Sequence, residues 1–367
     1  MSIAAIEAIP IRLERRRPVR FANGEVSTAE HVLVRVVADD GAVGVAEASP
    51  RPMTYGDTPG AVVDALRTLI VPAVIGADER NIEAVHGRLR HVVHNVTARA
   101  ALDVALWDLK ARRAQLPLAE LLGGSTRRVQ VAHLLGLDTP RAMAEEAEAV
   151  ARGFGVRAFK VKVGQSFRED VERAAAVRSA VGDEATLYLD ANHGWTAEEA
   201  LAVMRALERA QIEIAWLEEP TPATETAARR WLVERLNLPV VADESATDLA
   251  SAASELTSGR AHWVSLKTGR TGFTFSRQIA DLSLGLGASV VVGSQIEGGL
   301  GALANLHLAA AFGACHRYPA EVTSGHGYTD DVVPPLPIED GWITVPDRPG
   351  LGLDIQEERL QALRMDR

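Results

Sequence analysis

The feature of this sequence that most constrains its fold is a strand-then-helix rhythm that begins near Val129. Short runs rich in β-branched residues alternate with amphipathic helical patterns such as "REDVERAAAVRSAV" and "TAEEALAVMRALERA". About eight alternations over roughly 200 residues favour an α/β fold of the (β/α) barrel type. A doubly wound open sheet is the alternative. The strand candidates are "VQVAHLLGL", "AFKVKVG", "TLYLDANHG", "IAWLEEP", "PVVADES", "HWVSLKTG", "SVVVGSQIE" and "RYPAEVT".

The N-terminal part has a different character. Two apolar runs around Asp40-Gly41 in "HVLVRVVADDGAVGVAEA" predict a β-hairpin. Helical spacing of apolar residues follows in "TPGAVVDALRTLIVPAVIG" and in the stretch from "NIEAVHGRLR" to "DLKARRA". A chain of 367 residues accommodates one large barrel and a smaller unit. We therefore expect an α+β domain over residues 1–117, completed by 341–367, and a barrel domain over 118–340.

Charge and composition exclude several classes of protein. The net charge of −10 at pH 7 argues against a nucleic-acid-binding protein, which would present a basic face. No uncharged apolar stretch of about 18 residues occurs, so no membrane-spanning segment is expected. The single cysteine, Cys315, excludes an internal disulfide, and the N-terminal order of apolar and basic residues is the reverse of a signal peptide. We therefore expect a cytoplasmic protein.

Polar residues follow three consecutive strand candidates at the point where each predicted strand ends. In a barrel these ends form the functional rim, so three carboxylates would meet there. Three carboxylates that repel one another in a low-dielectric cavity would have raised pKa values unless a cation neutralised them. A set of oxygen ligands favours Mg²⁺ or Mn²⁺. The alternative is that these side chains cap the helices that follow. The residues are Asp190 and Asn192 in "LYLDAN", Glu218 and Glu219 in "AWLEEP", and Asp243 and Glu244 in "VVADES".

Lysines occupy the strand ends on either side of these carboxylates. Lys160 and Lys162 share one face of "AFKVKVG", and Lys267 ends "VSLK". Nearby positive charge lowers the pKa of a lysine towards the value that general base catalysis needs. On this interpretation Lys162 is the acid/base, and Lys160 lowers its pKa and helps to carry negative charge. The alternative is that the lysines reach solvent or form ion pairs with the carboxylates.

Five motifs in this order resemble those of the enolase superfamily, specifically its muconate lactonizing subgroup. "KVKVG" resembles the family's Lys-x-Lys strand, "DAN", "EEP" and "ADES" its three metal-binding segments, and "SLKTGRTG" the opposite lysine strand. The tail "RPGLGLDI" is similar to the family's closing segment. The resemblance implies that Asp190, Glu218 and Asp243 bind Mg²⁺ or Mn²⁺ and that Lys162 and Lys267 are the acid/base pair. Glu219 then supports a ligand, and Glu244, next to Asp243 in the chain, is the alternative assignment for the third ligand.

The resemblance also implies a TIM-like barrel of seven or eight (β/α) units with an N-terminal α+β capping domain. Loops of that domain close over the barrel mouth, and residues 16–31 and 49–60 occupy those loop positions. Both loops resemble a bacterial branch of muconate cycloisomerases more than dipeptide epimerases. Residues expected to contact the substrate or to support the site are Asn192, Glu219, Glu244, Glu297, Glu321, Tyr55 and Arg20, with Lys160 beside the acid/base pair.

The implied reaction is the metal-assisted lactonisation of cis,cis-muconate. One carboxylate of the substrate meets the cation, the other adds to the diene, and a lysine protonates the resulting enolate. The same residues could instead racemise or epimerise an N-acyl amino acid or a dipeptide, or dehydrate a carboxylate substrate. A barrel that only binds a metal-carboxylate ligand is the non-enzymatic alternative. Members of the family commonly form homo-oligomers, dimers or octamers, so we expect the same here, with a small-molecule carboxylate as the substrate.

Overall fold

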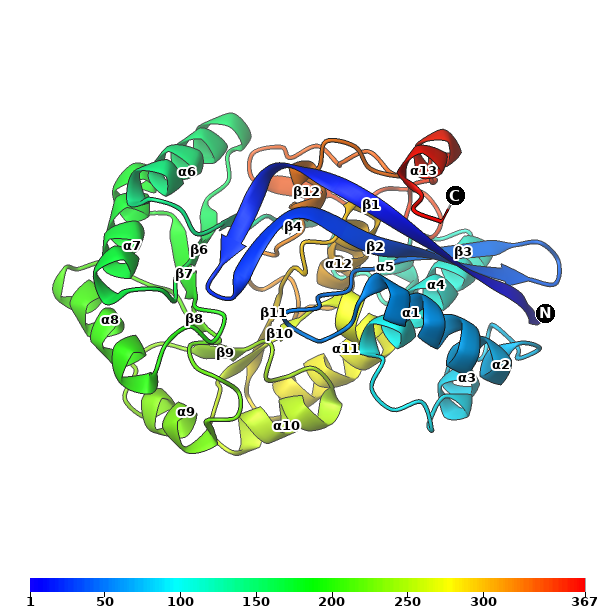
Figure 1. Ribbon diagram of the computed structural model, residues 1–367, viewed down its shortest axis with the longest axis horizontal. Helices are drawn as coiled ribbons and strands as arrows, with labels where there is room; N and C mark the ends of the chain where they lie inside the picture. Colours follow the sequence, from blue (N-terminus) through cyan, green and yellow to red (C-terminus); the bar gives the residue numbers. More distant parts are fainter. Residues whose placement is uncertain (367) are drawn as a thin grey trace.

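The computed structural model describes residues 1–366 and begins with an antiparallel sheet in the order β1-β2-β3 (Figure 1). Its strands are β1 (Ile3–Phe21), β2 (Gly24–Ala38) and β3 (Val43–Ala48). The hairpin predicted at Asp40-Gly41 joins β2 to β3 and is confirmed. Gly41 has a φ of 84°, a left-handed conformation that glycine adopts without steric cost. Its N–H donates to the Ala38 carbonyl oxygen at 2.9 Å, which closes the turn.

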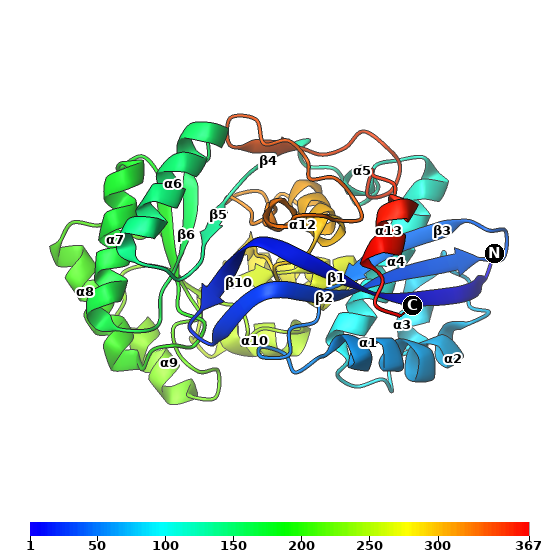
Figure 2. The same ribbon diagram turned by 45° about the horizontal axis from the view of Figure 1, so that its top comes forward.

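The segment 16–31, which we expected to be a loop, is instead the distal half of a long hairpin. Strands β1 and β2 remain paired from Ile3 opposite Ala38 to Phe21 opposite Gly24. A register shift between Glu14 and Val19 takes up Pro18, which has no N–H to donate to a partner strand. Figures 1 and 2 show the tip of this hairpin lying over the parallel sheet. The hairpin therefore carries capping residues to the mouth of the larger sheet.

The N-terminal part contains several helices. They are α1 (Pro59–Ala65), a π-helical turn (Leu66–Ile70), α2 (Val71–Val74), α3 (Ile82–Arg88), α4 (Val96–Ala114) and α5 (Leu118–Leu121). Of these, α1, α2 and α4 contact the small sheet. Helix α4 lies directly against β3, where a Cβ atom on Gly44 would come within 2.0 Å of the Ala105 carbonyl oxygen. Any side chain at Gly44 would push the sheet and the helix apart.

The larger sheet is parallel and curled, and its seven strands follow one another in chain order from β5 to β11. Its strands are β5 (His133–Leu135), β6 (Ala158–Lys162), β7 (Thr186–Asp190), β8 (Leu217–Glu218), β9 (Val240–Ala242), β10 (Trp263–Leu266) and β11 (Ser289–Val292). Its helices are α6 (Pro140–Phe154), α7 (Phe167–Val181), α8 (Ala197–Arg209), α9 (Thr226–Val233), α10 (Leu249–Thr257), α11 (Thr268–Gly285) and α12 (Gly299–Ala311). A doubly wound sheet would reverse its strand order partway. The unbroken order excludes that alternative.

The eighth strand candidate, "RYPAEVT", was wrong as a regular strand, because among residues 1–366 it forms only one isolated bridge, between Ala320 and Val131. Pro319 removes one backbone donor from this segment. Its backbone nevertheless reaches both ends of the curled sheet. Ala320 accepts from the N–H of Ala132 at 2.8 Å, and the N–H of Glu321 donates to Val292 of β11 at 2.9 Å.

The first strand candidate, "VQVAHLLGL", divides into two strands. Its first half is β4 (Arg128–Gln130), which pairs antiparallel with β12 (Trp342–Thr344), and its second half is β5. After a short 3₁₀ turn (Ser324–Gly327) and β12, the chain ends near helix α13 (Glu357–Leu363). The N–H of Met365 donates to the carbonyl of Pro10 in β1 at 3.0 Å. The C-terminal segment therefore contacts both the N-terminal sheet and β4, the strand that precedes the parallel sheet.

A cluster of aromatic side chains packs inside the curled sheet, below the ends of its strands. Tyr188 of β7 stacks on Trp216 with ring centroids 4.1 Å apart. Trp216 also packs against Trp263 and Tyr318. These rings pack in the same sheet whose strand ends carry the predicted polar residues. None of the helices in residues 1–366 has both the length and the apolar character needed to cross a membrane.

Asp108 links three parts of the fold, and its removal is expected to destabilise the protein. This fully buried carboxylate accepts from the N–H of Val45 at 2.9 Å, from the N–H of Leu351 at 2.7 Å and from Arg112 Nε at 2.8 Å. The substitution Asp108→Ala leaves the N–H groups of Val45 and Leu351 without this acceptor, and each unsatisfied buried donor costs about 1–3 kcal/mol. Urea unfolding measures the loss. Glu148→Ala, which removes an exposed helical pair, should change stability by less than about 0.5 kcal/mol, and equal effects of the two variants would contradict the assignment.

Candidate active site

The predicted carboxylates lie next to one another because their strands are adjacent and in register. Asp190 ends β7 and pairs in register with Glu218, which ends β8. Asp243 follows directly after β9, the next strand of the sheet. All three side chains are buried. The sequence therefore brings three acids to one edge of the sheet, as its strand-end pattern predicts.

The three lysines lie among these acids and form ion pairs with them. Lys160 Nζ is 2.8 Å from Glu218 Oε1 and 3.0 Å from Asp190 Oδ2. Lys162 Nζ is 2.6 Å from Asp190 Oδ2. Lys267, at the end of β10, contacts Asp243 from the other side of the carboxylate series. Two amines thus flank the acids, one on β6 and one on β10.

These contacts shift the pKa values of both partners. Burial acts to raise the pKa of Asp190, but the ammonium groups of Lys160 and Lys162 outweigh it and lower that pKa. Burial acts to lower the pKa of Lys267, but the negative charge of Asp243 outweighs this effect and raises that pKa. The pKa of Lys160 is raised well above its ordinary value by Asp190 and Glu218, again against the effect of burial. We expected crowding by positive charge to lower a lysine pKa, but at Lys160 and Lys267 the ion pairs dominate.

Of the three predicted ligands Asp190, Glu218 and Asp243, Glu218 is the one with an incomplete set of partners. Its Oε2 atom is buried and accepts no hydrogen bond. Burial raises the pKa of Glu218 well above its ordinary value, and the ammonium of Lys160 offsets this only in part. An anionic oxygen in this position needs a further positive charge.

The donor set fits a divalent cation in its chemistry. Asp190, Glu218 and Asp243 offer only oxygen atoms, which Mg²⁺ and Mn²⁺ prefer, and Glu218 Oε2 is free to bind. Within residues 1–366 no three acidic, histidine or cysteine side chains converge closely enough to hold an ion as they stand. Asp190 and Asp243 instead form ion pairs with lysines. Cation binding would therefore require these lysines to release part of their ion pairs.

Asn192, Glu219 and Glu244 surround the carboxylates in different ways. Asn192 Oδ1 accepts from Lys162 Nζ at 2.6 Å, and its Nδ2 donates to Glu244 at 2.8 Å. Burial, reinforced by the charge of Asp243, raises the pKa of Glu244 to about 7. Glu219 turns away from the cavity, where it accepts from the N–H of Asp243 at 2.6 Å and pairs with Arg229 at 2.5 Å. Asn192 and Glu244 line the cavity, whereas Glu219 holds the backbone that carries Asp243.

Glu297 and Glu321 lie near the cavity but do not line it. Glu297 accepts from the N–H of Gln295 at 2.6 Å and from Ser324 Oγ at 2.9 Å, and so orders the segment after β11. Glu321 is 2.8 Å from Lys160 Nζ, below the rim. Both carboxylates therefore act on the shape and charge of the site through other residues.

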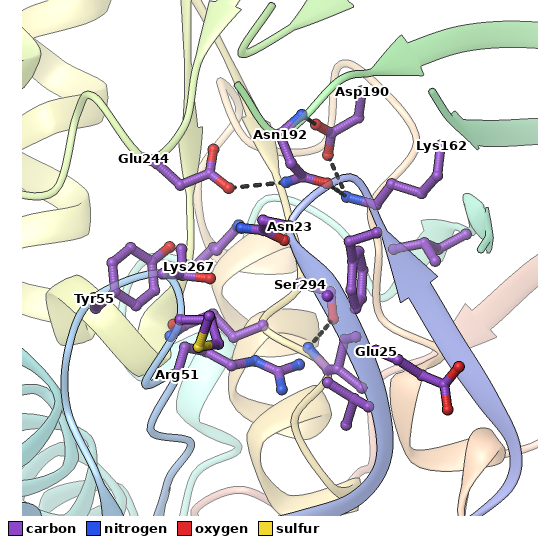
Figure 3. A pocket seen from close by; sticks show the side chains of 18 of the residues that line it. Asn23, Glu25, Arg51, Tyr55, Lys162, Asp190, Asn192, Glu244, Lys267 and Ser294 are labelled. Atoms are coloured by element: carbon purple, nitrogen blue, oxygen red, sulfur yellow. Dashed lines mark hydrogen bonds and ion pairs between the residues drawn. The ribbon is translucent and has the colours of Figure 1, made fainter. Parts of the chain in front are cut away.

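A cavity of about 110 Å³ opens above the strand ends, between the rim and the capping segments (Figure 3). The hairpin tip covers one side, and the ring of Phe21 lies with its centroid 4.9 Å from Lys162 Nζ. Tyr55, from the predicted loop 49–60, lines the cavity and accepts from Arg270 Nη1 at 3.0 Å. The lining residues are Phe21, Asn23, Gly24, Glu25, Val26, Arg51, Pro52, Met53, Thr54, Tyr55, Leu134, Lys160, Lys162, Asp190, Asn192, Glu244, Lys267, Ser294, Gln295 and Ile296.

Arg20 is not among these lining residues, although we expected it to contact the substrate. Its side chain is 53% exposed, and its Nε donates to Glu25 at 2.6 Å. Arginine candidates that we did not select are Arg51, which lines the cavity, and Arg270, which is buried 2.8 Å from Asp243. In the motif "SLKTGRTG" Arg270 comes three residues after Lys267, in the first turn of α11, so its closeness to Lys267 was a usable signal.

The choice of basic residue also distinguishes this cluster. The chain has four lysines, and three of them, Lys160, Lys162 and Lys267, lie here; the fourth, Lys110, lies on α4. Arginine supplies nearly all other basic side chains of the chain. A guanidinium cannot release its proton in a protein, whereas an ammonium can. The use of lysine at this position fits proton transfer better than a purely structural charge.

Comparisons with known proteins agree with this geometry. The model of the mandelate racemase / muconate lactonizing enzyme N-terminal domain matches residues 5–123, and that of the enolase C-terminal domain-like family matches residues 142–359. The solved structure of a muconate lactonizing enzyme from Mucobacterium smegmatis, complexed with muconolactone, is 42% identical, with a TM-score of 0.97 and 100% of each chain covered.

Curated relatives include other activities on the same fold. An N-succinyl-L-Arg/Lys racemase from Bacillus cereus is 29% identical and covers 99% of this chain and 98% of its own. An L-Ala-D/L-Glu epimerase from Bacillus subtilis is 30% identical and covers 96% of this chain and 97% of its own. The chain is therefore an enzyme that belongs to the enolase superfamily, in its mandelate racemase / muconate lactonizing enzyme group.

Proposed function

We propose that this enzyme lactonises cis,cis-muconate, with Lys162 and Lys267 as its acid/base residues. The observation that carries the proposal is that these two amines reach one cavity from β6 and β10, on either side of the acids. One substrate carboxylate adds to the conjugated diene, forming a C–O bond and an enolate next to the other carboxylate. A lysine ammonium then gives a proton to the carbon next to that carboxylate. The muconate dianion becomes the muconolactone monoanion, with net uptake of one proton.

Asp190, Glu218 and Asp243 are the residues that would hold Mg²⁺ or Mn²⁺. When bound, a divalent cation stabilises the negative charge that develops on the substrate carboxylate. The ammonium of Lys160, 2.8 Å from Glu218 and from Glu321, adds fixed positive charge beneath this region. In a site that excludes water, such preorganised charge contributes strongly to catalysis.

Two observations favour muconate over the substrates of the other relatives. Among solved structures, the muconate lactonizing enzyme from Mucobacterium smegmatis is 42% identical, against 30% for the L-Ala-D/L-Glu epimerase from Bacillus subtilis and 28% for the N-succinyl Arg/Lys racemase from Bacillus cereus. The cavity above the strand ends combines charged side chains with apolar ones. Its apolar walls suit a diene; they are formed by Phe21, Val26, Met53, Leu134 and Ile296.

Racemisation or epimerisation is the second candidate function. The same two lysines could remove an α-proton on one side of the substrate carbon and return it on the other, and the racemase and epimerase relatives span nearly the whole chain. Dehydration of a carboxylate substrate would use the same residues. A homo-oligomeric state and a cytoplasmic location remain predictions.

The test is to incubate the purified enzyme with Mg²⁺ or Mn²⁺ and cis,cis-muconate. We expect loss of the ultraviolet absorbance of the diene and formation of muconolactone, both abolished by a chelator. N-succinyl amino acids and dipeptides in D₂O serve as the comparison. Deuterium uptake into those compounds, with no consumption of muconate, would contradict lactonisation and support the second candidate.

A further inference from the structure

The cationic groups at the cavity divide into those with an anionic partner and one without. Lys160 and Lys162 pair with Asp190, Lys267 pairs with Asp243, and each of these carboxylates lies at the rim. Nearby, Arg270 and Arg20 also have carboxylate partners within 3 Å. The guanidinium of Arg51 lines the cavity but makes no ion pair and no side-chain hydrogen bond with any residue of the described chain, 1–366.

The backbone holds Arg51 in a restricted conformation. Its neighbours Pro50 and Pro52 fix their own φ angles and limit the residue that precedes each of them. The carbonyl of Arg51 accepts from the N–H of Thr54 at 3.0 Å and from that of Tyr55 at 2.8 Å, which forms a turn. A side chain that starts from a rigid turn loses less conformational entropy on binding than one on a flexible loop.

The surroundings of Arg51 make an unpaired charge costly. Burial lowers the pKa of Arg51, and the nearby groups Tyr328 and Glu297 offset this only in part. A partly buried guanidinium without a partner is stabilised by an anion that reaches it. In Figure 3 Arg51 lies across the cavity from Asp190 and Lys162, so an anion bound there is separated from the carboxylate rim.

We propose that Arg51 binds a second carboxylate of the substrate, so that the cavity selects dicarboxylates. The planar guanidinium matches a carboxylate with two parallel hydrogen bonds. One substrate carboxylate meets the rim of Asp190, Glu218 and Asp243, and the other meets Arg51, with the apolar walls between them. This inference rests on the proposed function for the position of the first carboxylate. For muconate, Arg51 holds the carboxylate that adds to the diene and fixes its position relative to the reacting carbon.

The binding test uses adipate, an unreactive diacid with the same number of carbons as muconate, and its monomethyl ester. Isothermal titration in the presence of Mg²⁺ gives a dissociation constant for each. Hydrogen bonds to charged groups imply that the wild-type enzyme binds adipate about 10- to 100-fold more tightly than the ester. Arg51→Gln should abolish this preference and lower kcat/KM for muconate by a similar factor, and Arg51→Lys should restore part of both. The control Arg230→Gln, on the exposed face of α9, should leave both unchanged.

The outcomes separate this inference from the proposed function. An enzyme that lactonises muconate while Arg51→Gln keeps the wild-type preference and kcat/KM would overturn the role of Arg51 alone. An enzyme that leaves muconate intact but prefers adipate through Arg51 would overturn lactonisation and support the dicarboxylate site. If Arg51→Gln fails to fold, the two dissociation constants of the wild-type enzyme, for adipate and for its monomethyl ester, still test the inference. Equal affinities for the two compounds would contradict it.

Discussion

Alanine in place of the lysine that delivers the proton, Lys162 or Lys267, is expected to lower kcat by about 100- to 10,000-fold, the usual contribution of a positioned general acid or base. Both amines lie in the cavity, where the third lining lysine, Lys160, is held by ion pairs with Asp190, Glu218 and Glu321. Steady-state kinetics on muconate measure the effect. Lys110→Ala is the matched control, because Lys110 lies on α4 against Trp107, away from the cavity, and its loss should leave kcat unchanged.

The pattern of the two lysine variants also distinguishes the candidate reactions. Lactonisation needs a single proton transfer to carbon, so one substitution should have a much larger effect on kcat than the other. Epimerisation needs one lysine to remove the proton and the other to return it, so both substitutions should abolish the net reaction. Full activity in both Lys162→Ala and Lys267→Ala would refute the assigned roles in either case.

Removal of the divalent cation, or of one of its proposed ligands, is expected to have the second large effect. Asp190→Asn, Glu218→Gln and Asp243→Asn each remove a negative charge from the set of buried oxygens that would hold the ion. Each variant should bind Mg²⁺ more than about 100-fold less tightly, since even residues that only support a ligand cost 10- to 100-fold. The kcat for muconate should fall together with the affinity for Mg²⁺.

The readout for these variants is metal content after dialysis together with the rise in melting temperature on addition of Mg²⁺. The wild-type enzyme should lose activity in a chelator and regain it with Mg²⁺ or Mn²⁺. Glu208→Gln, an exposed acid on α8, is the matched control and should bind metal normally. Unchanged Mg²⁺ affinity in all three ligand variants would show that the ion, if required, binds elsewhere.

Much of the architecture can be predicted from the sequence because its pattern is periodic. Strand-then-helix alternation predicts a parallel sheet in chain order, and Asp40-Gly41 predicts the turn between β2 and β3. The hairpin over 16–31 was not predictable in this way, because its arginine run and Pro18 are typical of a loop. Its pairing depends on a register shift that only the opposite strand reveals. The eighth strand failed for a related reason, since "RYPAEVT" has an apolar pattern but only Ala320 finds a partner in a bridge.

The site shows the same division between local pattern and tertiary arrangement. Strand ends are local features, so the sequence indicates that Asp190, Glu218, Asp243 and the lysines gather, although their catalytic roles remain predictions. The direction in which a loop side chain points depends on tertiary contacts and not on the local sequence pattern. Arg20 and Arg51 both lie in capping segments, but Arg20 pairs with Glu25 at the surface while Arg51 faces the cavity. The raised pKa of Lys267 likewise depends on its ion pair with Asp243, which sequence spacing does not reveal.

Proton transfer from a lysine to the substrate carbon is the step on which this account depends, and isotope labelling measures it directly. The wild-type enzyme is incubated with cis,cis-muconate and Mg²⁺ in D₂O, and the product is analysed by nuclear magnetic resonance. We expect muconolactone with one deuterium in a single configuration at the carbon beside its free carboxylate, and no such product from the lysine variant with the low kcat. A lactone labelled equally in both configurations, or formed at the same rate by both lysine variants, would show that solvent rather than Lys162 or Lys267 supplies the proton.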